Sequence, residues 1–191
     1  MQQLSLKPTH KPVRAYYDTL ARFHAIGVSH ETAVRSAFFS LLDSCGRQCH
    51  LTLVPEWPMK RGRNQRIIVD GALIDRSTLT RGYWEAKDSQ DDLEREIDKK
   101  FSAGYPTDNI LFQAPERAIL WQNDRQVLDA DLTQVDQLIE TLATLLEYRP
   151  PDYIEWDTAV AEFKDRVPDL ATGLVGLIER ERHTSTRFKF A

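Results

Sequence analysis

The most informative residues of this sequence form two apolar runs, Ile67-Ile68-Val69-Asp70-Gly71-Ala72-Leu73-Ile74-Asp75 and Gly82-Tyr83-Trp84-Glu85-Ala86-Lys87. Both runs predict short β-strands, because they are rich in β-prone side chains and bounded by turn-forming or charged residues. The residues between them, 76–81, predict a hairpin loop. A hairpin folded about residues 77 and 78 places Asp70 opposite Glu85.

Strand periodicity brings charged side chains together on this hairpin. Side chains alternate between the two faces of a strand, so Glu85 and Lys87 share a face. Two carboxylates and an ammonium group then meet on one patch of the sheet, unless the hairpin is a surface feature whose charges face solvent. Asp75 is a rival for the first carboxylate, but it has the opposite strand parity to Asp70 and lies beside the turn.

The chemistry of this patch suits a divalent metal. Mg²⁺ prefers oxygen ligands and keeps several waters, so Asp70 and Glu85 are the expected metal ligands, with Mn²⁺ as a substitute. A bound metal polarises a phosphoryl oxygen and lowers the pKa of a bound water. Lys87 is the expected catalytic cation, because an ammonium group stabilises the negative charge that develops during attack. The patch therefore predicts hydrolysis of phosphodiester bonds.

Two helices are expected before the hairpin. Apolar residues recur at helical spacing over Val13–Ala25 and again over Ser29–Leu42, with Ser29 as a candidate N-cap. Glu31 and Arg35 are four residues apart and share one helix face. By themselves they are equally consistent with an ordinary exposed ion pair.

The pattern resembles the PD-(D/E)XK nuclease superfamily, with Asp70 as the first carboxylate and Glu85-Ala86-Lys87 as the later half of the motif. Val69 stands where the superfamily usually has proline. More narrowly, residues 13–150 resemble the nuclease domain that begins single-polypeptide restriction-modification enzymes of the type ISP and type IIG kind. The resemblance implies a restriction-endonuclease-like fold, double-stranded DNA as substrate, and linked helicase or methyltransferase domains.

The same resemblance adds residues to the expected site. It implies that Glu31 completes the catalytic set through a metal-bound water, and that Arg35 lies near the DNA. It also implies that the helix after the motif carries side chains that approach the site or the DNA, for which Lys99 and Lys100 are the candidates.

The remaining chain fits an α/β domain with a central mixed β-sheet flanked by helices. A charged helix or connector is expected over residues 89–101, strands over 109–113, 118–122 and 126–128, and an amphipathic helix over 133–148. Arg149-Pro150-Pro151-Asp152 breaks this pattern. The expected domains are a leader at 1–12, a nuclease domain at 13–150 and a helical connector at 151–191. The connector is expected to consist of two helices, 156–166 and 171–182, split by Pro168, and to lead to further domains.

The net charge of −4 argues against a dedicated high-affinity DNA binder. Four cations nevertheless fall within seven residues just before the Asp70 strand, where they form either a solvated loop or a phosphate-contacting loop. These candidate DNA contacts are Lys60, Arg61, Arg63 and Arg66. Modest intrinsic affinity fits a nuclease domain that other domains deliver to DNA.

Composition narrows the class further. With 28% charged and 41% hydrophobic residues the chain is globular, and it lacks both a membrane-length apolar run and a signal-peptide core. Two cysteines without a second ligand pair fit reduced thiols in a cytoplasmic protein. The expected function is a Mg²⁺-dependent DNA endonuclease. A catalytically inactive nucleic-acid-binding module and a protein-interaction domain remain the alternatives.

Overall fold

The computed structural model describes residues 3–27, 31–61, 65–88 and 92–184, and the side chains at 31–32, 60–61, 65–66, 151–159 and several later positions lie outside that description. The chain divides into two compact units, Met1–Tyr148 and Arg149–Ala191. Within the described residues the first unit contains α1 (Lys11–Ala25), α2 (Glu31–Gln48), β1 (Thr52–Arg61), β2 (Gln65–Ile74), β3 (Thr80–Ala86), α3 (Leu93–Ser102), β4 (Asn109–Gln113), β5 (Arg117–Gln122), β6 (Arg125–Asp131) and α4 (Val135–Leu146). The second unit contains α5 (Pro151–Thr184).

The six strands form one mixed sheet in the order β1-β2-β3-β4-β5-β6. Neighbouring strands are antiparallel except for β3 and β4, which run parallel. A parallel pair needs a crossover connection, and α3 supplies it here. The predicted α/β class with a mixed central sheet and flanking helices is confirmed.

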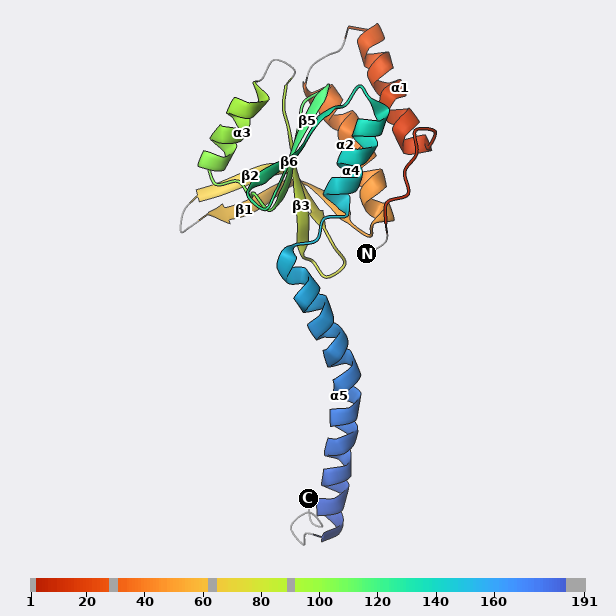
Figure 1. Cartoon of the computed structure of the whole chain (residues 1–191), viewed down its shortest axis with the longest axis vertical. Helices are drawn as coiled ribbons and strands as arrows, with labels where there is room; N and C mark the ends of the chain where they lie inside the picture. The colour runs from red at the N-terminus through yellow and green to blue at the C-terminus, as the bar shows by residue number, and fades with distance from the viewer. Residues whose placement is uncertain (1–2, 28–30, 62–64, 89–91, 185–191) are drawn as a thin grey trace. The chain divides into compact units, whose positions relative to one another are not determined.

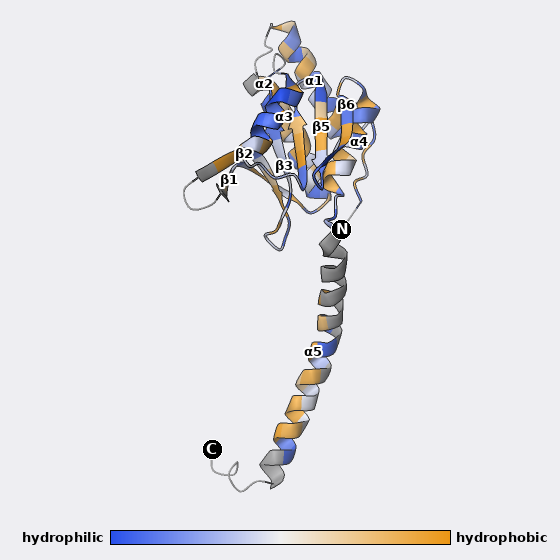
Figure 2. Cartoon of the chain, turned by 60° about the vertical axis from the view of Figure 1, so that its left-hand side comes forward, coloured by the Kyte–Doolittle hydropathy of each residue, from blue (hydrophilic) through white to orange (hydrophobic). Residues whose placement is uncertain are grey.

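Helices cover both faces of this sheet (Figure 1). On one face α1, α2 and α4 enclose a core that includes Phe38, Leu42, Trp84 and Leu138. On the other face α3 packs through Leu93 and Ile97 against a smaller cluster of sheet residues. Figure 2 shows the apolar character of β5 between these layers, as expected of a strand that is covered on both sides. The charged helix or connector expected over residues 89–101 is a helix, α3, over Leu93–Ser102, and its buried Leu93 and Ile97 attach an otherwise largely exposed helix to the sheet.

Strand β1 was absent from the predicted elements. Its sequence holds Pro55 and Pro58, which read as breakers because proline cannot donate to a sheet ladder. The strand is tolerated because β1 lies at the edge of the sheet, where one side of the ladder needs no donor. Glu56, between the prolines, has a φ of 50° and interrupts the pairing with β2.

Two further expectations are corrected near the ends of the chain. The leader at 1–12 is not separate from the domain, because Leu4 is buried in the main core and its N–H donates to Glu147 Oε1 at 2.8 Å. The two helices expected around Pro168 form one helix, α5, with Pro168 inside it. No helix among the described residues is long and apolar enough to cross a membrane.

Candidate active site

The candidate site lies where the β2–β3 ladder ends. The ladder pairs Ile74 with Thr80 at the turn and reaches Gly71 and Trp84 at its far end. The next residue on each strand is a carboxylate, Asp70 on β2 and Glu85 on β3. The register is therefore the one that the hairpin predicts, with Asp70 facing Glu85.

Beyond Gly71 and Trp84, side chains replace the backbone ladder. The backbone N–H of Ala86 donates to Asp70 Oδ2 at 2.8 Å, and the backbone N–H of Asp70 makes a longer contact of 3.4 Å to Glu85 Oε2. Each carboxylate thus binds the main chain of the opposite strand. The two acids are held at a fixed separation by backbone groups rather than by flexible side chains.

Close packing beneath the acids explains the glycine beside Asp70. A Cβ atom at Gly71 would lie 2.9 Å from Leu53 Cδ1 and 3.0 Å from Trp84 Cε3. A larger residue here would have to displace the Leu53 side chain and press on the Trp84 ring. The glycine lets these two side chains pack directly against β2 beside Asp70.

Three cations converge on the two carboxylates. Lys87, which follows β3, places its Nζ 3.1 Å from Glu85 Oε1, and Lys100 from α3 places its Nζ 2.5 Å from the same oxygen. Arg35 from α2 binds Asp70 Oδ1 through Nη2 at 2.9 Å. The side chains of Glu85, Lys87 and Asp70 are 5%, 10% and 20% exposed, so these charges interact with little screening by water.

Tyr105 completes the cluster, and sequence reasoning missed it. Its hydroxyl donates to the carbonyl oxygen of Ile68 on β2 at 2.9 Å and accepts from Lys100 Nζ at 3.0 Å. Tyr105 therefore links Lys100 to the strand that carries Asp70. It lies in the connection after α3, outside any recognisable motif, so no local pattern could have identified it.

Burial and the neighbouring acid shift the proton equilibrium of Asp70. Desolvation raises the pKa of this carboxyl and the Glu85 carboxylate raises it further, while the Ala86 N–H, Arg35 and Lys87 act in the opposite direction. For Lys100, burial acts to lower the pKa, but the hydrogen bonds to Glu85 and Tyr105 outweigh it and the pKa is raised. Lys100 is consequently held as a cation.

The donor set fits a divalent cation. Burial first, and the Glu85 carboxylate second, raise the pKa of Asp70, and a divalent cation held by the two acids would offset their mutual repulsion. Among the described residues no group of three His, Cys, Asp or Glu side chains could hold a metal. A metal here would take two protein carboxylates and fill its other positions with water or phosphate oxygens, as Mg²⁺ commonly does.

Asp75, the rival first carboxylate, lies outside this cluster. Its Oδ1 accepts the N–H groups of Ser77 and Leu79 at 2.8 and 2.9 Å, and its Oδ2 binds Arg81. Burial acts to raise the pKa of Asp75, but the hydrogen bonds from Leu79, Arg81 and Ser77 lower it overall. Asp75 therefore shapes the β2–β3 loop.

The other candidate residues divide into two groups. Lys99 pairs with Glu96 on the exposed side of α3. Glu31 begins α2, the helix that carries Arg35, but its side chain lies outside the described residues, as do the side chains of Lys60, Arg61 and Arg66 and the whole of Arg63.

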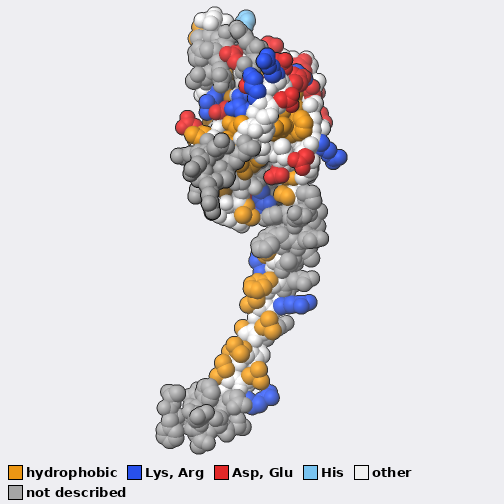
Figure 3. Space-filling view, turned by 90° about the vertical axis from the view of Figure 1, so that its left-hand side faces the viewer, with side chains coloured by type: hydrophobic (Ala, Val, Ile, Leu, Met, Phe, Trp, Pro, Cys, Tyr) orange, Lys and Arg blue, Asp and Glu red, His pale blue; other side chains and the backbone are white. Residues whose placement is uncertain are grey.

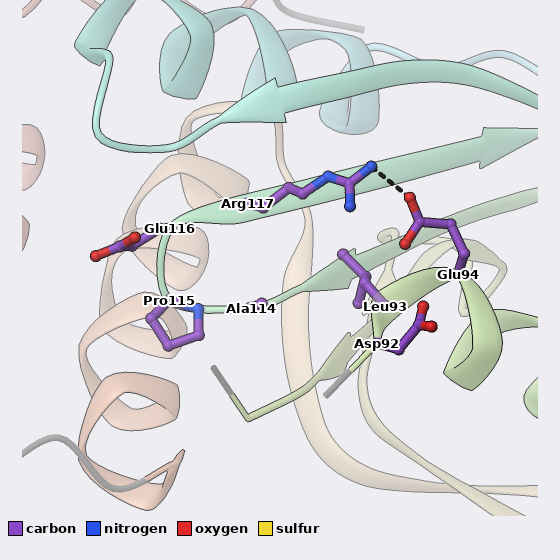
Figure 4. A pocket seen from close by; sticks show the side chains of 7 residues that line it. All are labelled: Asp92, Leu93, Glu94, Ala114, Pro115, Glu116 and Arg117. Carbon is purple, nitrogen blue, oxygen red and sulfur yellow. Dashed lines mark hydrogen bonds and ion pairs between the residues drawn. The ribbon is translucent and has the colours of Figure 1, made fainter. Parts of the chain in front are cut away.

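A groove of about 510 Å³ opens where α3 begins and β4 ends (Figure 4). Its lining includes Asp92, Glu94 and Glu116, and Arg117 is the cation that lines it. Arg117 already binds Glu94 at 2.6 Å and Asp129 at 2.7 Å. The groove is thus mainly acidic and does not suit a phosphate group.

Comparison with known proteins supports the fold. No family model and no curated protein matches the chain. Among solved structures, a chain of a DrdV–DNA complex determined by cryo-EM is similar, with 32% sequence identity and a TM-score of 0.74. The similarity covers 90% of this chain and 17% of the DrdV chain, so this chain spans about one sixth of that protein. The likeness agrees with a restriction-endonuclease-like α/β fold.

Proposed function

We propose that this chain is a Mg²⁺-dependent DNA endonuclease of the PD-(D/E)XK type, which hydrolyses phosphodiester bonds as part of a larger restriction-modification enzyme. The observation that carries the proposal is the convergence of Asp70, Glu85 and Lys87 at the end of the β2–β3 ladder. Similarity to a chain found in a DrdV–DNA complex supports DNA as the partner.

Asp70 and Glu85 are the residues that would hold the metal. When bound, Mg²⁺ supplies Lewis acidity toward a phosphoryl oxygen and lowers the pKa of a coordinated water. The backbone N–H of Ala86 keeps Asp70 aimed at the site, and the backbone N–H of Asp70 does the same for Glu85. The acids are therefore preorganised without a metal.

Lys87 is the residue that acts on the reacting groups. Its ammonium group is 10% exposed and lies 3.1 Å from Glu85 Oε1, so it stays beside the carboxylates. In so dry a site an ammonium group hydrogen-bonds an attacking water or stabilises charge on a phosphoryl oxygen more strongly than it would in solvent. These are the roles that we assign to Lys87.

Arg35 and Lys100 neutralise the acids in the metal-free protein. Arg35 binds Asp70, and Lys100 binds Glu85 with support from Tyr105. If Asp70 and Glu85 held a metal, Arg35 and Lys100 would be the cations able to bind a DNA phosphate instead. Glu31 and the cations of residues 60–66 belong to the proposal as further catalytic and DNA contacts, and the natural setting is cytoplasmic, beside linked helicase or methyltransferase domains.

Calorimetry of cation binding tests the metal site directly. Mn²⁺ is titrated into the wild-type protein, Asp70→Ala and the control Asp98→Ala, which removes an exposed carboxylate from α3. We expect binding by the wild type and the control and a loss of at least tenfold in Asp70→Ala. Circular dichroism verifies that each variant is folded. Equal binding by all three proteins would make Asp70 an ordinary surface acid and would favour the protein-interaction alternative.

Cleavage of supercoiled plasmid then separates a nuclease from an inactive DNA-binding module. Wild type, Lys87→Ala and the exposed control Lys7→Ala are compared with Mg²⁺, with Mn²⁺ and with chelator. Loss of nicking in Lys87→Ala alone supports the assigned role. If Mn²⁺ binds through Asp70 and DNA is bound without any cut in either metal, the inactive module is the correct reading.

A further inference from the structure

The hydroxyl group of Tyr105 joins two parts of the candidate site that come from different elements. It donates to the carbonyl oxygen of Ile68 on β2 at 2.9 Å and accepts from Lys100 Nζ on α3 at 3.0 Å. The Lys100 ammonium group also lies over the Tyr105 ring, 4.7 Å from its centre, where the ring face attracts a cation. Tyr105 therefore contacts this lysine both through its hydroxyl and through its ring.

The turn that ends α3 brings the backbone of Tyr105 back to Lys100. Gly104, with a φ of 91°, donates its N–H to the carbonyl oxygen of Phe101 at 2.8 Å, and the N–H of Tyr105 donates to the carbonyl oxygen of Lys100 at 3.1 Å. These two bonds form a Schellman turn, in which glycine takes the left-handed conformation. Packing of α3 and Tyr105 into the smaller apolar cluster then decides that the two side chains meet over β2.

The contact with Ile68 falls where β2 has few backbone partners. On β1 this residue is opposite Pro58, which has no N–H to donate, and the pairs with β3 begin at Gly71. The Tyr105 hydroxyl supplies a donor to the Ile68 carbonyl oxygen. Because this contact anchors the tyrosine on β2, the hydroxyl oxygen stands at a fixed place from which it can hold Lys100.

Lys100 has a competing acid on its own helix. Glu96 lies four residues earlier, a spacing at which glutamate and lysine pair on one helix face, and it already binds Lys99. Figure 3 views the first unit from the side on which α3 lies in Figure 1, and it shows basic side chains intermingled with acidic ones there. A long lysine side chain loses entropy when it stays in a single ion pair. The Tyr105 hydroxyl offsets that loss for the conformation that reaches Glu85.

We propose that Tyr105 is a positioning residue that holds the Lys100 ammonium group against Glu85 and away from Glu96. Lys100 Nζ lies 2.5 Å from Glu85 Oε1 and 3.0 Å from the Tyr105 hydroxyl, so one ammonium group binds both partners at once. The effect of this positioning on DNA cleavage rests on the proposed function. The positioning itself does not, because every contact that supports it exists in the protein without metal or DNA.

Nuclear magnetic resonance of the lysine ammonium groups tests the positioning without metal or DNA. An ammonium group gives a sharp signal only when hydrogen bonds slow the exchange of its protons with water. Isotope-labelled wild-type chain is compared with Tyr105→Phe and with the control Tyr17→Phe, which removes a hydroxyl that donates to the carbonyl oxygen of Leu132 at 2.8 Å. Lys100→Met identifies the Lys100 signal by its disappearance.

We expect the Lys100 signal in the wild type and in Tyr17→Phe, and a signal at least tenfold weaker in Tyr105→Phe. The phenylalanine keeps the ring that packs in the apolar cluster, and circular dichroism verifies that the variant is folded. An undiminished signal in Tyr105→Phe would overturn the proposal. So would the absence of a Lys100 signal from the wild type, a result that needs no variant to fold.

A double-variant cycle shows whether the held lysine matters for cleavage. Single-turnover nicking of supercoiled plasmid in Mg²⁺ is measured for wild type, Tyr105→Phe, Lys100→Met and the double variant. We expect Tyr105→Phe to slow nicking at least fivefold, Lys100→Met to slow it at least as much, and the double variant to match Lys100→Met within twofold. An equal loss from Tyr105→Phe with and without Lys100 would show that the hydroxyl acts only through β2 and would refute positioning. If the wild type cuts no DNA while the Lys100 signal still depends on Tyr105, the positioning stands and the nuclease assignment fails.

Discussion

Two lysines form ion pairs with the same buried acid, Glu85, and this shared carboxylate allows a quantitative prediction about stability. Lys87 and Lys100 approach the same oxygen, Oε1, from the end of β3 and from α3. Removing one lysine as Lys100→Met or Lys87→Met leaves the other to neutralise the carboxylate. Removing both leaves a carboxylate that is 5% exposed with no ammonium partner.

The distances set the scale of the effect. At an effective dielectric constant of about 20, unit charges separated by 2.5 and 3.1 Å attract by about 7 and about 5 kcal/mol before desolvation is subtracted. Desolvation cancels most of this attraction, so each single substitution should lower the free energy of unfolding by about 1.5 kcal/mol. The second loss leaves an uncompensated buried charge and should add about 3–5 kcal/mol. The double variant therefore loses about 4.5–6.5 kcal/mol, more than the sum of about 3 kcal/mol.

Urea unfolding at pH 7, followed by near-ultraviolet circular dichroism, measures these free energies in wild type, both single variants and the double variant. The same lysine substitutions in a Glu85→Gln background are the control, because a neutral amide leaves no charge to compensate. If the stability loss of the double variant equals the sum of the two single losses within about 0.5 kcal/mol, the shared ion pair is refuted. An equally large loss of stability for the double lysine variant in the Glu85→Gln background would also refute it.

Three further outcomes follow from the geometry of the hairpin. Asp75→Ala should lower the free energy of unfolding by about 2–4 kcal/mol, because Arg81 loses its buried ion pair with this carboxylate. The same variant should bind Mn²⁺ as the wild type does. Because folding lowers the pKa of Asp75, the loss of stability should shrink as the pH falls below about 4. Gly82→Ala puts a Cβ 2.6 Å from Asn109 Nδ2, which binds the Arg81 carbonyl, and should cost about 1–3 kcal/mol in thermal unfolding; an unchanged melting temperature would contradict this. Asp70→Asn should gain stability relative to wild type as the pH rises above about 4 in chelator, because the raised pKa of Asp70 makes its ionised form unfavourable in the folded state; a variant that becomes relatively less stable with rising pH would reverse that sign.

The parts of the fold that local rules specify could be predicted from the sequence. Strand parity and a hairpin centred on residues 77 and 78 predict that Asp70 faces Glu85. The pair of Ile74 and Thr80 beside the turn would by itself carry Asp70 opposite Trp84, and the register shift between Leu73 and Ile74, which the sequence does not reveal, restores the expected pairing. The edge strand β1 could not be predicted, since its prolines are acceptable only where a neighbouring strand is missing on one side. Tyr105 could not be predicted as a site residue for a related reason. Its contacts with Ile68 and Lys100 depend on how α3 packs across the sheet, which no local pattern encodes.

The contrast between Asp70 and Asp75 shows how one residue type acquires two roles within a single strand run. Asp75 lies at the turn, where free N–H groups are close at hand, and it binds two of them and Arg81. Asp70 lies where the ladder has ended, so it binds one N–H and faces another acid across the gap. Its charge must then be balanced by Arg35 from a distant helix, as that of Glu85 is by Lys100. In the protein without metal these cations contact the acids, although they do not fully offset the burial of Asp70. On the proposed function, a metal that takes the acids also frees cations for the DNA phosphate, so metal and DNA should strengthen each other's binding.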